Sequence, residues 1–590
     1  DWACRAATDL WSLLAMKITR HFVTVGNRRV HYLRAGSGPA VAMLHACPVS
    51  AKVMRPLMKI FARRFTCLAF DMPGFGQSDK LPIAQPSVED FADALAETLT
   101  ALGIQKAASY GRHTGASIAV EFAARHPDRC TMALADGYAV FAQRYSDEAL
   151  ERYLEPITPA WDGAHLLRLW FRYRDQHVFW PWNAQDDAHR SDTDAPEPEF
   201  IHRGVIEMLE AGNDYRIGYR APFRHRELAV IDDLKVPVCF GNRPGDSMYK
   251  TRPLYPAGIW DADVPREFQA ASEMELELLS RHPADTPPPA APDCVALAGR
   301  STDRFVDIDG AQVLVRSIGD LTGNQAPLLI IHHAPGSSWL YRELMANLGQ
   351  STPVIAIDLP GHGESEPLPG NSQTVATWAD TVAAVLDRLS VSQVHALGHN
   401  GGAAVALELA VGWPQRVASL LLDAPFFLGD TDRALFQSHP APTLEIDPEG
   451  VHLLRAWHHL RDSELWWPWF RREKAFQSPR PSRLDPEVLT ERAREVLKQP
   501  AGYAAAWRSI VEYQCAGRLA ACVQPRVVLA ANNDLASHLI EPIAKAANAR
   551  ALRCEPGQKA DLILRFIDSL PAACCSPGQC KPGCCSPTQP

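Results

Sequence analysis

Gly-Arg-His-Thr-Gly at residues 111–115 and Gly-His-Asn-Gly-Gly at residues 398–402 are the two stretches that decide the fold of this chain. In each Gly-x-X-x-Gly turn, small glycines let the central residue adopt a strained conformation with its side chain pointing outward. The central residues are His113 and Asn400, so neither turn has a Ser, Cys or Asp at its apex. The segments expected to flank the turns are strands at 107–110 and 394–397 and helices at 116–125 and 403–411.

The two turns lie 287 residues apart, and several other motifs repeat with the same offset. A period of this length indicates two copies of one domain rather than a solenoid, whose repeats are tens of residues long. The repeated motifs are Leu-His-Ala-Cys-Pro at 44–48 with Ile-His-His-Ala-Pro at 331–335, Asp-Met-Pro-Gly-Phe-Gly-Gln-Ser at 71–78 with Asp-Leu-Pro-Gly-His-Gly-Glu-Ser at 358–365, and His-Leu-Leu-Arg at 165–168 and 452–455.

The repeat divides the 590 residues into two domains of ordinary size. The segment between the copies is rich in proline, which indicates a semi-rigid, extended linker. The last residues are rich in Cys, Pro and Gly and cannot build a core. We therefore expect an N-terminal extension at 1–15, a first domain at 16–283, a linker at 284–302, a second domain at 303–572 and a Cys-rich tail at 573–590.

Apolar segments alternate with helix-forming segments in both copies, which predicts an α/β fold with a mainly parallel sheet and helices on both of its faces. Alternating residues at the start of each copy, 22–33 and 305–315, are suited to paired strands. The buried strands are expected at 41–44, 67–70, 132–135, 328–331, 354–357 and 420–422, and two of the helices at 87–102 and 374–389.

The net charge, the length of the apolar stretches and the spacing of the cysteines indicate which partners and which compartment to expect. The net charge is −9 without long runs of one sign, so we expect no nucleic-acid partner. No stretch approaches the roughly 18 apolar residues of a membrane span, so we expect no membrane contact. The cysteines outside the tail have no spacing typical of a disulfide framework, and a cytoplasmic, reducing setting is therefore expected.

The motifs resemble those of the α/β-hydrolase superfamily, and within it the branch of haloalkane dehalogenases and epoxide hydrolases. The His-x-x-Pro loop, the Asp-x-Pro-Gly-x-Gly-x-Ser turn, the Gly-x-X-x-Gly turn and a Trp-rich segment carry the resemblance, over about residues 20–280 and 303–570. It implies two tandem domains, each a mainly parallel sheet flanked by helices, with a helical cap over the pocket. One fold hosts many chemistries, so the resemblance leaves the reaction open.

The resemblance also implies where catalytic groups would lie. The nucleophile position is occupied by His113 in the first copy and by Asn400 in the second, at the two turns. Oxyanion-hole donors would be the backbone amides of Cys47 and Thr114, and of Ala334 and Gly401. The catalytic acid would be Asp246 or, alternatively, Asp136 in the first copy, and Asp534 or Asp423 in the second.

The base histidine of such a site is missing from both copies. It would be expected about 25 residues after the acid, near Ile259–Asp261 and near Gln558–Lys559, and neither place holds a His. Loss of the nucleophile or the base from a Ser-His-Asp unit costs about 10⁶ in rate. A standard serine hydrolase is therefore excluded, whereas His113 retains a side chain that can act as base or nucleophile at neutral pH.

Two further groups are candidates for function. The cap should begin near His165, Arg168 and Trp170, which correspond to His452, Arg455 and Trp457. These side chains either contact the substrate or fix the cap by structural hydrogen bonds and packing. The tail gathers thiols suited to Cu(I) or Zn²⁺, although their spacing matches no zinc finger and they can equally be an unstructured end: Cys574, Cys575, Cys580, Cys584 and Cys585.

Two function hypotheses remain open. In the first, the first domain is an enzyme of hydrolase descent that acts on a small, largely apolar or carbonyl-containing molecule through His113, needs no cofactor, and is joined to a degenerate second domain. In the second, both domains are catalytically inactive and form a ligand-binding or scaffold protein with a protein partner and a metal-binding tail. A titratable group at the first turn but not at the second favours the first hypothesis.

Overall fold

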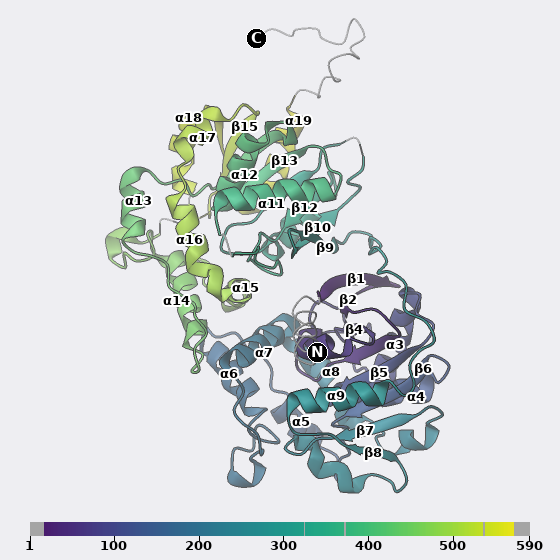
Figure 1. Cartoon of the computed structure of the whole chain (residues 1–590). Helices are drawn as coiled ribbons and strands as arrows, with labels where there is room; N and C mark the ends of the chain where they lie inside the picture. The colour runs from purple at the N-terminus through teal and green to yellow at the C-terminus, as the bar shows by residue number, and fades with distance from the viewer. Residues whose placement is uncertain (1–16, 324, 371–372, 479, 535–536, 571–590) are drawn as a thin grey trace, which may run out of the picture.

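The chain forms two lobes that lie one above the other along a common long axis (Figure 1). A computed structural model describes residues 17–323, 325–370, 373–478, 480–534 and 537–570. The expected extension at 1–15 and the tail at 573–590 lie outside the described residues. Neither a helix nor a strand lies between Leu279 and Thr302, all of whose residues are described.

Each lobe contains one eight-stranded sheet, and the two sheets have the same strand order. Read from the N-terminal strand, the orders are β1-β2-β4-β3-β5-β6-β7-β8 and β9-β10-β12-β11-β13-β14-β15-β16. The second strand of each sheet, β2 or β10, pairs antiparallel with both of its neighbours, and the remaining pairs are parallel. The repeat read from the sequence is therefore a repeat of fold.

The strands of the first lobe are β1 (Thr19–Val25), β2 (Arg28–Ala35), β3 (Ala40–Leu44), β4 (Thr66–Phe70), β5 (Ala107–Arg112), β6 (Cys130–Asp136), β7 (Val238–Asn242) and β8 (Trp260–Asp263). Those of the second are β9 (Thr302–Ile308), β10 (Ala311–Ile318), β11 (Leu328–Ile331), β12 (Val354–Ile357), β13 (Val394–His399), β14 (Val417–Asp423), β15 (Arg526–Ala531) and β16 (Arg550–Cys554).

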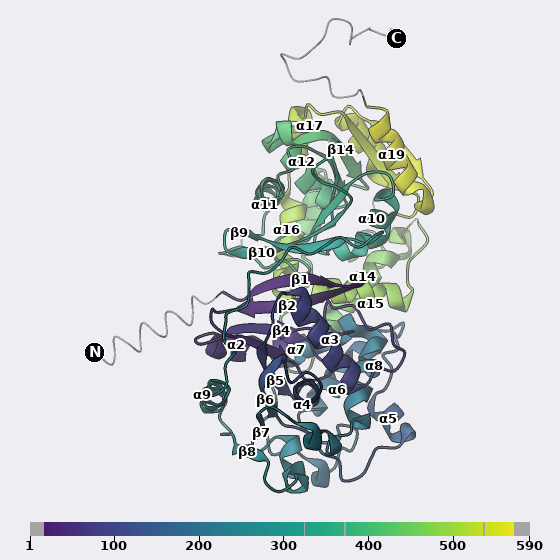
Figure 2. The same cartoon turned by 90° about the vertical axis from the view of Figure 1, so that its right-hand side faces the viewer.

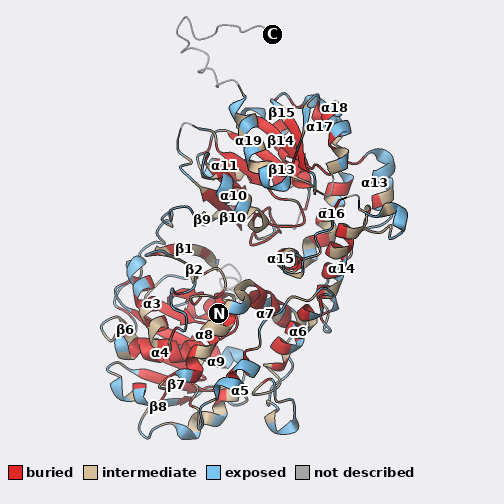
Figure 3. Cartoon of the chain, turned by 180° about the vertical axis from the view of Figure 1, so that it is seen from behind, coloured by how far each residue is buried: buried red, intermediate tan, exposed pale blue. Residues whose placement is uncertain are grey.

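Central strands are buried on both faces, because helices cover each side of each sheet (Figure 3). All five residues of β3 are buried, as expected for a strand that pairs with parallel neighbours on both edges. One face is covered by α3 (Val88–Ala101) and α4 (Thr114–Arg125) in the first lobe, and by α11 (Val375–Arg388), α12 (Gly402–Gly412) and α18 (Ile540–Ala546) in the second. The opposite face is covered by α2 (Arg55–Phe61) and α9 (Phe268–Leu279), and by α10 (Arg342–Leu348) and α19 (Lys559–Asp568).

Helix α3 begins at a reciprocal capping box, which Ser87 and Asp90 form at its N-terminus.

A group of helices is inserted after the sixth strand of each sheet and forms a cap beside that sheet. The cap of the first lobe contains α5 (Asp147–Tyr153), α6 (Ala164–Asp175), α7 (Pro198–Ala211) and α8 (Tyr215–Arg220), and that of the second contains α13 (Asp430–Gln437), α14 (Val451–Leu465), α15 (Pro486–Leu497), α16 (Tyr503–Glu512) and α17 (Cys515–Ala521).

The two lobes contact each other through equivalent surfaces. Strand β1 lies against β9, where the rings of Phe22 and Phe305 stack at 5.6 Å (Figure 2). Cap helix α6 packs on α14, and α7 packs on α15. Arg20, which is almost fully buried, donates a hydrogen bond from Nη2 to the Gln312 carbonyl at 3.2 Å. The lobes therefore form an internal pseudo-dimer.

The two lobes carry opposite charges at one pair of equivalent positions in this contact. Glu207 and Glu495 each accept a hydrogen bond from an equivalent serine, Ser50 or Ser337, in the same lobe. One helical turn further along, the first lobe has Glu210 and the second has Lys498. These two side chains are only 5% and 9% exposed, and they pair across the contact with 3.1 Å between Oε1 and Nζ.

Among the described residues, no helix combines the length and the apolar character that crossing a bilayer requires.

Candidate functional site

The two Gly-x-X-x-Gly turns have the strained geometry that their sequences predict. His113 lies between β5 and α4 with φ 50° and ψ −109°, and Asn400 lies between β13 and α12 with φ 50°. Residues other than glycine rarely have positive φ, and such strain is typical of functional turns. The side chain of His113 is 34% exposed, so the imidazole remains accessible at the apex of the turn.

A carboxylate holds this imidazole in place. Asp246, in the loop after β7, lies 2.8 Å from His113 Nε2 through Oδ2 and 3.0 Å through Oδ1. Met248 also donates its backbone N–H to Asp246 Oδ1 at 2.8 Å. Burial alone would raise the pKa of Asp246, but His113 and Arg112 outweigh it and hold the pKa below its ordinary value. Asp246 is therefore an ionised acceptor for the Nε2 proton of His113.

Gly137, directly after β6, makes room for this pair. Its φ is +67°, and a Cβ atom there would lie 2.6 Å from Cδ2 and 3.0 Å from Nε2 of His113. The corresponding residue of the second lobe is Ala424, also at positive φ (44°), and it accompanies the smaller side chain of Asn400. The first lobe thus combines the imidazole of His113 with a glycine behind the turn, and the second lobe combines the side-chain amide of Asn400 with an alanine.

Asp136, the alternative acid, has other partners. It accepts a hydrogen bond from the hydroxyl of Tyr110 at 3.0 Å, and Arg243 Nη2 lies 3.4 Å from its Oδ2. Arg243 also donates to Glu275 Oε1 at 3.0 Å. Burial, followed by the charge of Asp136, raises the pKa of Glu275 to about 8. Asp136 meets His113 only through its backbone carbonyl, which accepts the His113 amide, so Asp246 is the acid that orients the ring.

A cavity of about 890 Å³ opens above the first turn. This volume lies in the upper part of the range of ligand sites, about 300–1,000 Å³, and accommodates a molecule larger than the small substrate expected from the sequence. Cys47 and Thr114, the expected oxyanion-hole residues, both line it beside His113. Thr114 is the first residue of α4, where the amide has no acceptor within the helix. Apolar side chains cover much of the remaining wall, including Val49, Met54, Phe141, Trp180, Phe223 and Met248.

In the second lobe the apex residue is bonded to its own turn. Asn400 Oδ1 accepts a hydrogen bond from the backbone N–H of Gly401 at 3.0 Å. That amide is one of the two expected oxyanion-hole donors, and the other belongs to Ala334, which is buried. The side chain of Asn400 thus occupies a donor that a carbonyl oxygen of a substrate would need.

A lysine, Lys559, occupies the position at which a base histidine would be expected in the second lobe. Lys559 begins α19, and its Nζ lies 2.9 Å from Asp423 Oδ2 and 2.8 Å from Asp534 Oδ2. Burial alone would raise the pKa of Asp423, but Lys559 and then His399 lower it to about 2. In the first lobe the last helix begins at Phe268, so the equivalent place is Phe268 and not Ile259–Asp261, which runs into strand β8.

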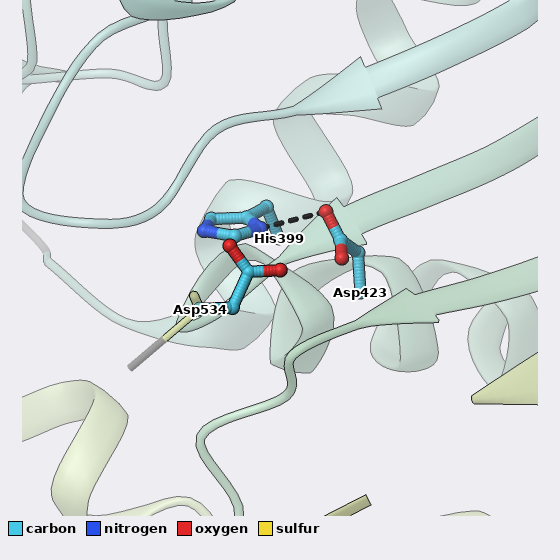
Figure 4. A group of neighbouring side chains, drawn as sticks. All are labelled: His399, Asp423 and Asp534. Carbon is cyan, nitrogen blue, oxygen red and sulfur yellow. Dashed lines mark hydrogen bonds and ion pairs between the residues drawn. The ribbon is translucent and has the colours of Figure 1, made fainter. Parts of the chain in front are cut away.

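His399, Asp423 and Asp534 point toward one another at the carboxyl edge of the second sheet (Figure 4). Their ligand atoms lie within 4.8 Å of one another, a spacing that could hold a metal ion. His399 Nδ1 donates to Asp423 Oδ2 at 2.7 Å, and the ammonium group of Lys559 contacts both carboxylates. Lys559 therefore already supplies the positive charge that these buried carboxylates require.

Four of the cap residues singled out in the sequence lie in the contact between the lobes instead of on the wall of this cavity: His165, Trp170, His452 and Trp457. His165 accepts from the Ala160 amide through Nδ1 and lies 2.9 Å from the Thr490 hydroxyl of the other lobe. The rings of His165 and Trp457 meet edge to face at 5.1 Å, and those of Trp170 and His452 do so at 5.4 Å.

The two arginines singled out with these residues form ion pairs of their own. Arg168 pairs with Glu155 through two hydrogen bonds, and Arg455 lies 3.6 Å from Asp447. Both arginines therefore pair within their own lobe.

Two functional candidates were not recognised in the sequence. His177 lines the cavity from the end of the cap segment that follows α6, and Lys559 holds both acids of the second lobe. Trp180, which belongs to the Trp-rich segment and could be either a packing or a cavity residue from the sequence, also lines the cavity. His177 breaks the repeat, since its equivalent is Glu464, and comparison of the two copies could have identified it.

Comparison with known proteins identifies the fold of both lobes. Residues 39–197 and 326–446 match the family described as alpha/beta hydrolase fold. An epoxide hydrolase from Vigna radiata is a similar solved structure: all of that chain aligns to 47% of this one, at 19% identity and a TM-score of 0.37.

Curated relatives match shorter segments. The dihydrolipoyllysine-residue acetyltransferase component of the acetoin cleaving system of Cupriavidus necator is 37% identical over 129 residues, which are 22% of this chain and 33% of that protein. The 2-hydroxy-6-oxononadienedioate/2-hydroxy-6-oxononatrienedioate hydrolase of Burkholderia vietnamiensis is 30% identical over 169 residues, 28% of this chain and 55% of that protein. This chain thus spans about a third of one relative and about half of the other.

Proposed function

In both of its lobes this chain is an alpha/beta hydrolase-fold protein, and on that premise we propose that the first lobe hydrolyses a carbonyl compound with His113 as the general base. The observation that carries the proposal is the 2.8 Å contact between His113 Nε2 and Asp246 at the apex of a turn that opens into a cavity of about 890 Å³. An ester or a lactone with a largely apolar body suits the lining.

The protonation state of His113 supports this role. Because ionised Asp246 accepts the Nε2 proton, Nδ1 carries the free electron pair of the neutral ring. Nδ1 has no hydrogen-bond partner among the residues that the structure describes. It is therefore free to take a proton from water in the cavity.

The proposed reaction proceeds through attack of water. The water oxygen bonds to the carbonyl carbon while its proton passes to His113 Nδ1, and Asp246 stabilises the resulting imidazolium. The amides of Cys47 and Thr114 donate to the oxyanion. When the tetrahedral intermediate collapses, the bond between carbon and the leaving oxygen breaks and that oxygen takes the proton from His113. General-base catalysis of this kind contributes about 10²–10⁴ in rate.

The second lobe is proposed to be degenerate. Asn400 has no basic atom at neutral pH and binds the amide of Gly401, and Asp534 is paired with Lys559. No side chain in the described part of this lobe thus combines the apex position with a proton-accepting group. Its contribution is the cap surface that packs against the first lobe.

Turnover of 4-nitrophenyl esters of increasing acyl length, and of a set of lactones, tests the proposal on the full chain. His113→Ala should lower kcat/KM by about 10²–10⁴, whereas the matched change Asn400→Ala should leave it within about twofold. Circular dichroism should find both variants folded. Turnover that survives His113→Ala would remove His113 as the base, and absence of turnover by the native chain on every substrate would favour the ligand-binding alternative.

A further inference from the structure

A second imidazole faces the cavity of the first lobe from the cap. His177 follows α6, and its ring lines the same cavity as His113. Its backbone is fixed on both sides: its amide donates to the Arg174 carbonyl at 3.0 Å, and its carbonyl accepts from the Thr193 hydroxyl at 2.9 Å. The main chain that carries the ring is therefore fixed on the wall of this cavity.

The surroundings of this ring provide no polar partner. The rings of Tyr173 and Phe200 meet it edge to face, each at 5.1 Å. Its Nε2 is buried and has no hydrogen-bond partner among the described residues. A buried polar atom without a partner costs about 1–3 kcal/mol, and each one in a native fold requires an explanation.

His177 is a neutral group at physiological pH. Burial, helped by the charges of Arg112 and His113, lowers its pKa to about 4. A neutral imidazole offers one N–H donor and one acceptor. His113 has Asp246 as its partner, and His177 has no carboxylate in contact among the described residues, so the two rings differ in chemistry.

The second lobe shows what this position of the fold can hold. Its equivalent position is Glu464, which follows Arg461-Asp462 as His177 follows Arg174-Asp175. Glu464 is buried and lies 2.7 Å from Arg480 and 2.5 Å from Arg492. At this position the second lobe thus holds a polar side chain, Glu464, whose carboxylate is paired. The first lobe holds His177, whose Nε2 has no hydrogen-bond partner among the described residues.

We propose that His177 is a substrate-contacting residue, a neutral hydrogen-bond donor from the cap that binds the leaving-group oxygen of the substrate. This assignment rests on the proposed function, because the oxygen that it names is the one that takes the proton from His113. No proton is transferred to or from His177.

Binding of 4-nitrobenzyl alcohol, a neutral analogue of the leaving group, tests the contact without any need for turnover. Isothermal titration of the full chain should give saturable binding. His177→Phe keeps an aromatic ring without the donor and should weaken binding about tenfold, the equivalent of one hydrogen bond. His177→Gln keeps an N–H donor and should bind within about threefold of the native chain. Unchanged thermal unfolding of both variants would establish that they are folded.

The outcomes separate this inference from the proposed reaction. His113→Ala should abolish turnover of the 4-nitrophenyl esters yet bind 4-nitrobenzyl alcohol within about threefold of the native chain. Equal affinity of His177→Phe and the native chain, or no binding by the native chain, would overturn the role of His177. Weaker binding by His177→Phe together with turnover that survives His113→Ala would instead retain His177 and reject the base.

Discussion

In the first lobe Asp246 accepts a hydrogen bond from His113, with 2.8 Å between Oδ2 and Nε2. In the second lobe Asp534 accepts one from Lys559, with the same distance between Oδ2 and Nζ. The two acids occupy equivalent places, five residues beyond the strand residues that pair with Asp136 and Asp423. One acid orients a titratable ring at the apex of the turn. The other is neutralised by a cation from the last helix.

The neighbouring acids differ in the same way. Asp136 is balanced by Arg243, which comes from the loop after β7, and Asp423 is balanced by Lys559, which comes from α19. Because a buried carboxylate requires a partner, moving the cation from one element to the other changes what the catalytic acid can reach. Arg112 of the first lobe also lies 3.7 Å from Asp136 and 3.5 Å from Asp246, and its equivalent in the second lobe is His399. The comparison teaches that the charged groups around these acids, and not the fold, decide whether an acid is available to the turn.

The largest effect should come from removing the cation of the second lobe. Lys559→Met leaves Asp423 and Asp534 buried without a positive partner, and we expect it to lower the free energy of unfolding of that lobe by about 3–5 kcal/mol. Differential scanning calorimetry would measure the loss. Lys545→Met, at an exposed lysine of the same lobe, serves as the control and should change it by less than about 0.5 kcal/mol. Equal effects of the two changes would break the comparison.

The next effect concerns the acid of the first lobe. Asp246→Asn removes the negative charge that stabilises protonated His113, and kcat/KM for the 4-nitrophenyl esters should fall about 10²-fold. Asp534→Asn alters only the partner of Lys559 and should leave turnover within about twofold. If both changes lowered turnover alike, the difference between the two lobes would lie elsewhere.

A smaller effect is expected from a substitution at Gly137, which lies behind the first turn. Gly137→Ala adds a methyl group 2.6 Å from His113 Cδ2, which should displace the ring from Asp246 and lower kcat/KM about tenfold. The backbone should tolerate the change, since Ala424 already has positive φ in the second lobe. Nuclear magnetic resonance titration of His113 should register the displacement, and Ala424→Gly is the matched control without effect on turnover. An unshifted His113 resonance in Gly137→Ala would rule out this positioning role.

The smallest effect is expected from pH on the second lobe. The lowered pKa of Asp423, about 2, means that its stabilising contribution is complete above its unfolded value near 3.9 and is lost only as pH falls through about 2. The pKa of Lys559 is raised, despite burial, by Asp423 and Asp534, so its contribution is lost only at strongly alkaline pH. In Lys559→Met this cation is missing and burial raises the pKa of the carboxylates, so the stability difference between the native chain and the variant should be largest at pH 9 and shrink toward pH 5. A difference that does not shrink toward pH 5, measured by calorimetry, would contradict the assigned partners.

Much of the fold could be predicted from the sequence because local patterns specify it. Apolar segments gave the buried strands to within a few residues, and the turns at 111–115 and 398–402 located the junction of strand and helix. The resemblance to the family also implied Asp246 and Asp534, beside the alternatives Asp136 and Asp423. These features depend on hydrogen bonding and burial within one domain, which leave a regular signal.

Contacts between distant segments left no comparable signal. Lys559 was passed over because a histidine was sought at its position, and its role depends on two carboxylates from other strands. For His165 and Trp170 the choice between substrate contact and a structural role stayed open, because the sequence gives no information on the docking of the two caps. Gly137 acquires its meaning only from the ring that lies over it.

The pair of Glu210 and Lys498 has a consequence for the pairing of the lobes. Since the two residues are equivalent and touch, an assembly of two identical lobes would bring carboxylate against carboxylate or ammonium against ammonium at this buried place. Like charges so opposed cost several kcal/mol. The opposite charges at these equivalent positions therefore favour pairing of the first lobe with the second over pairing of either lobe with a copy of itself.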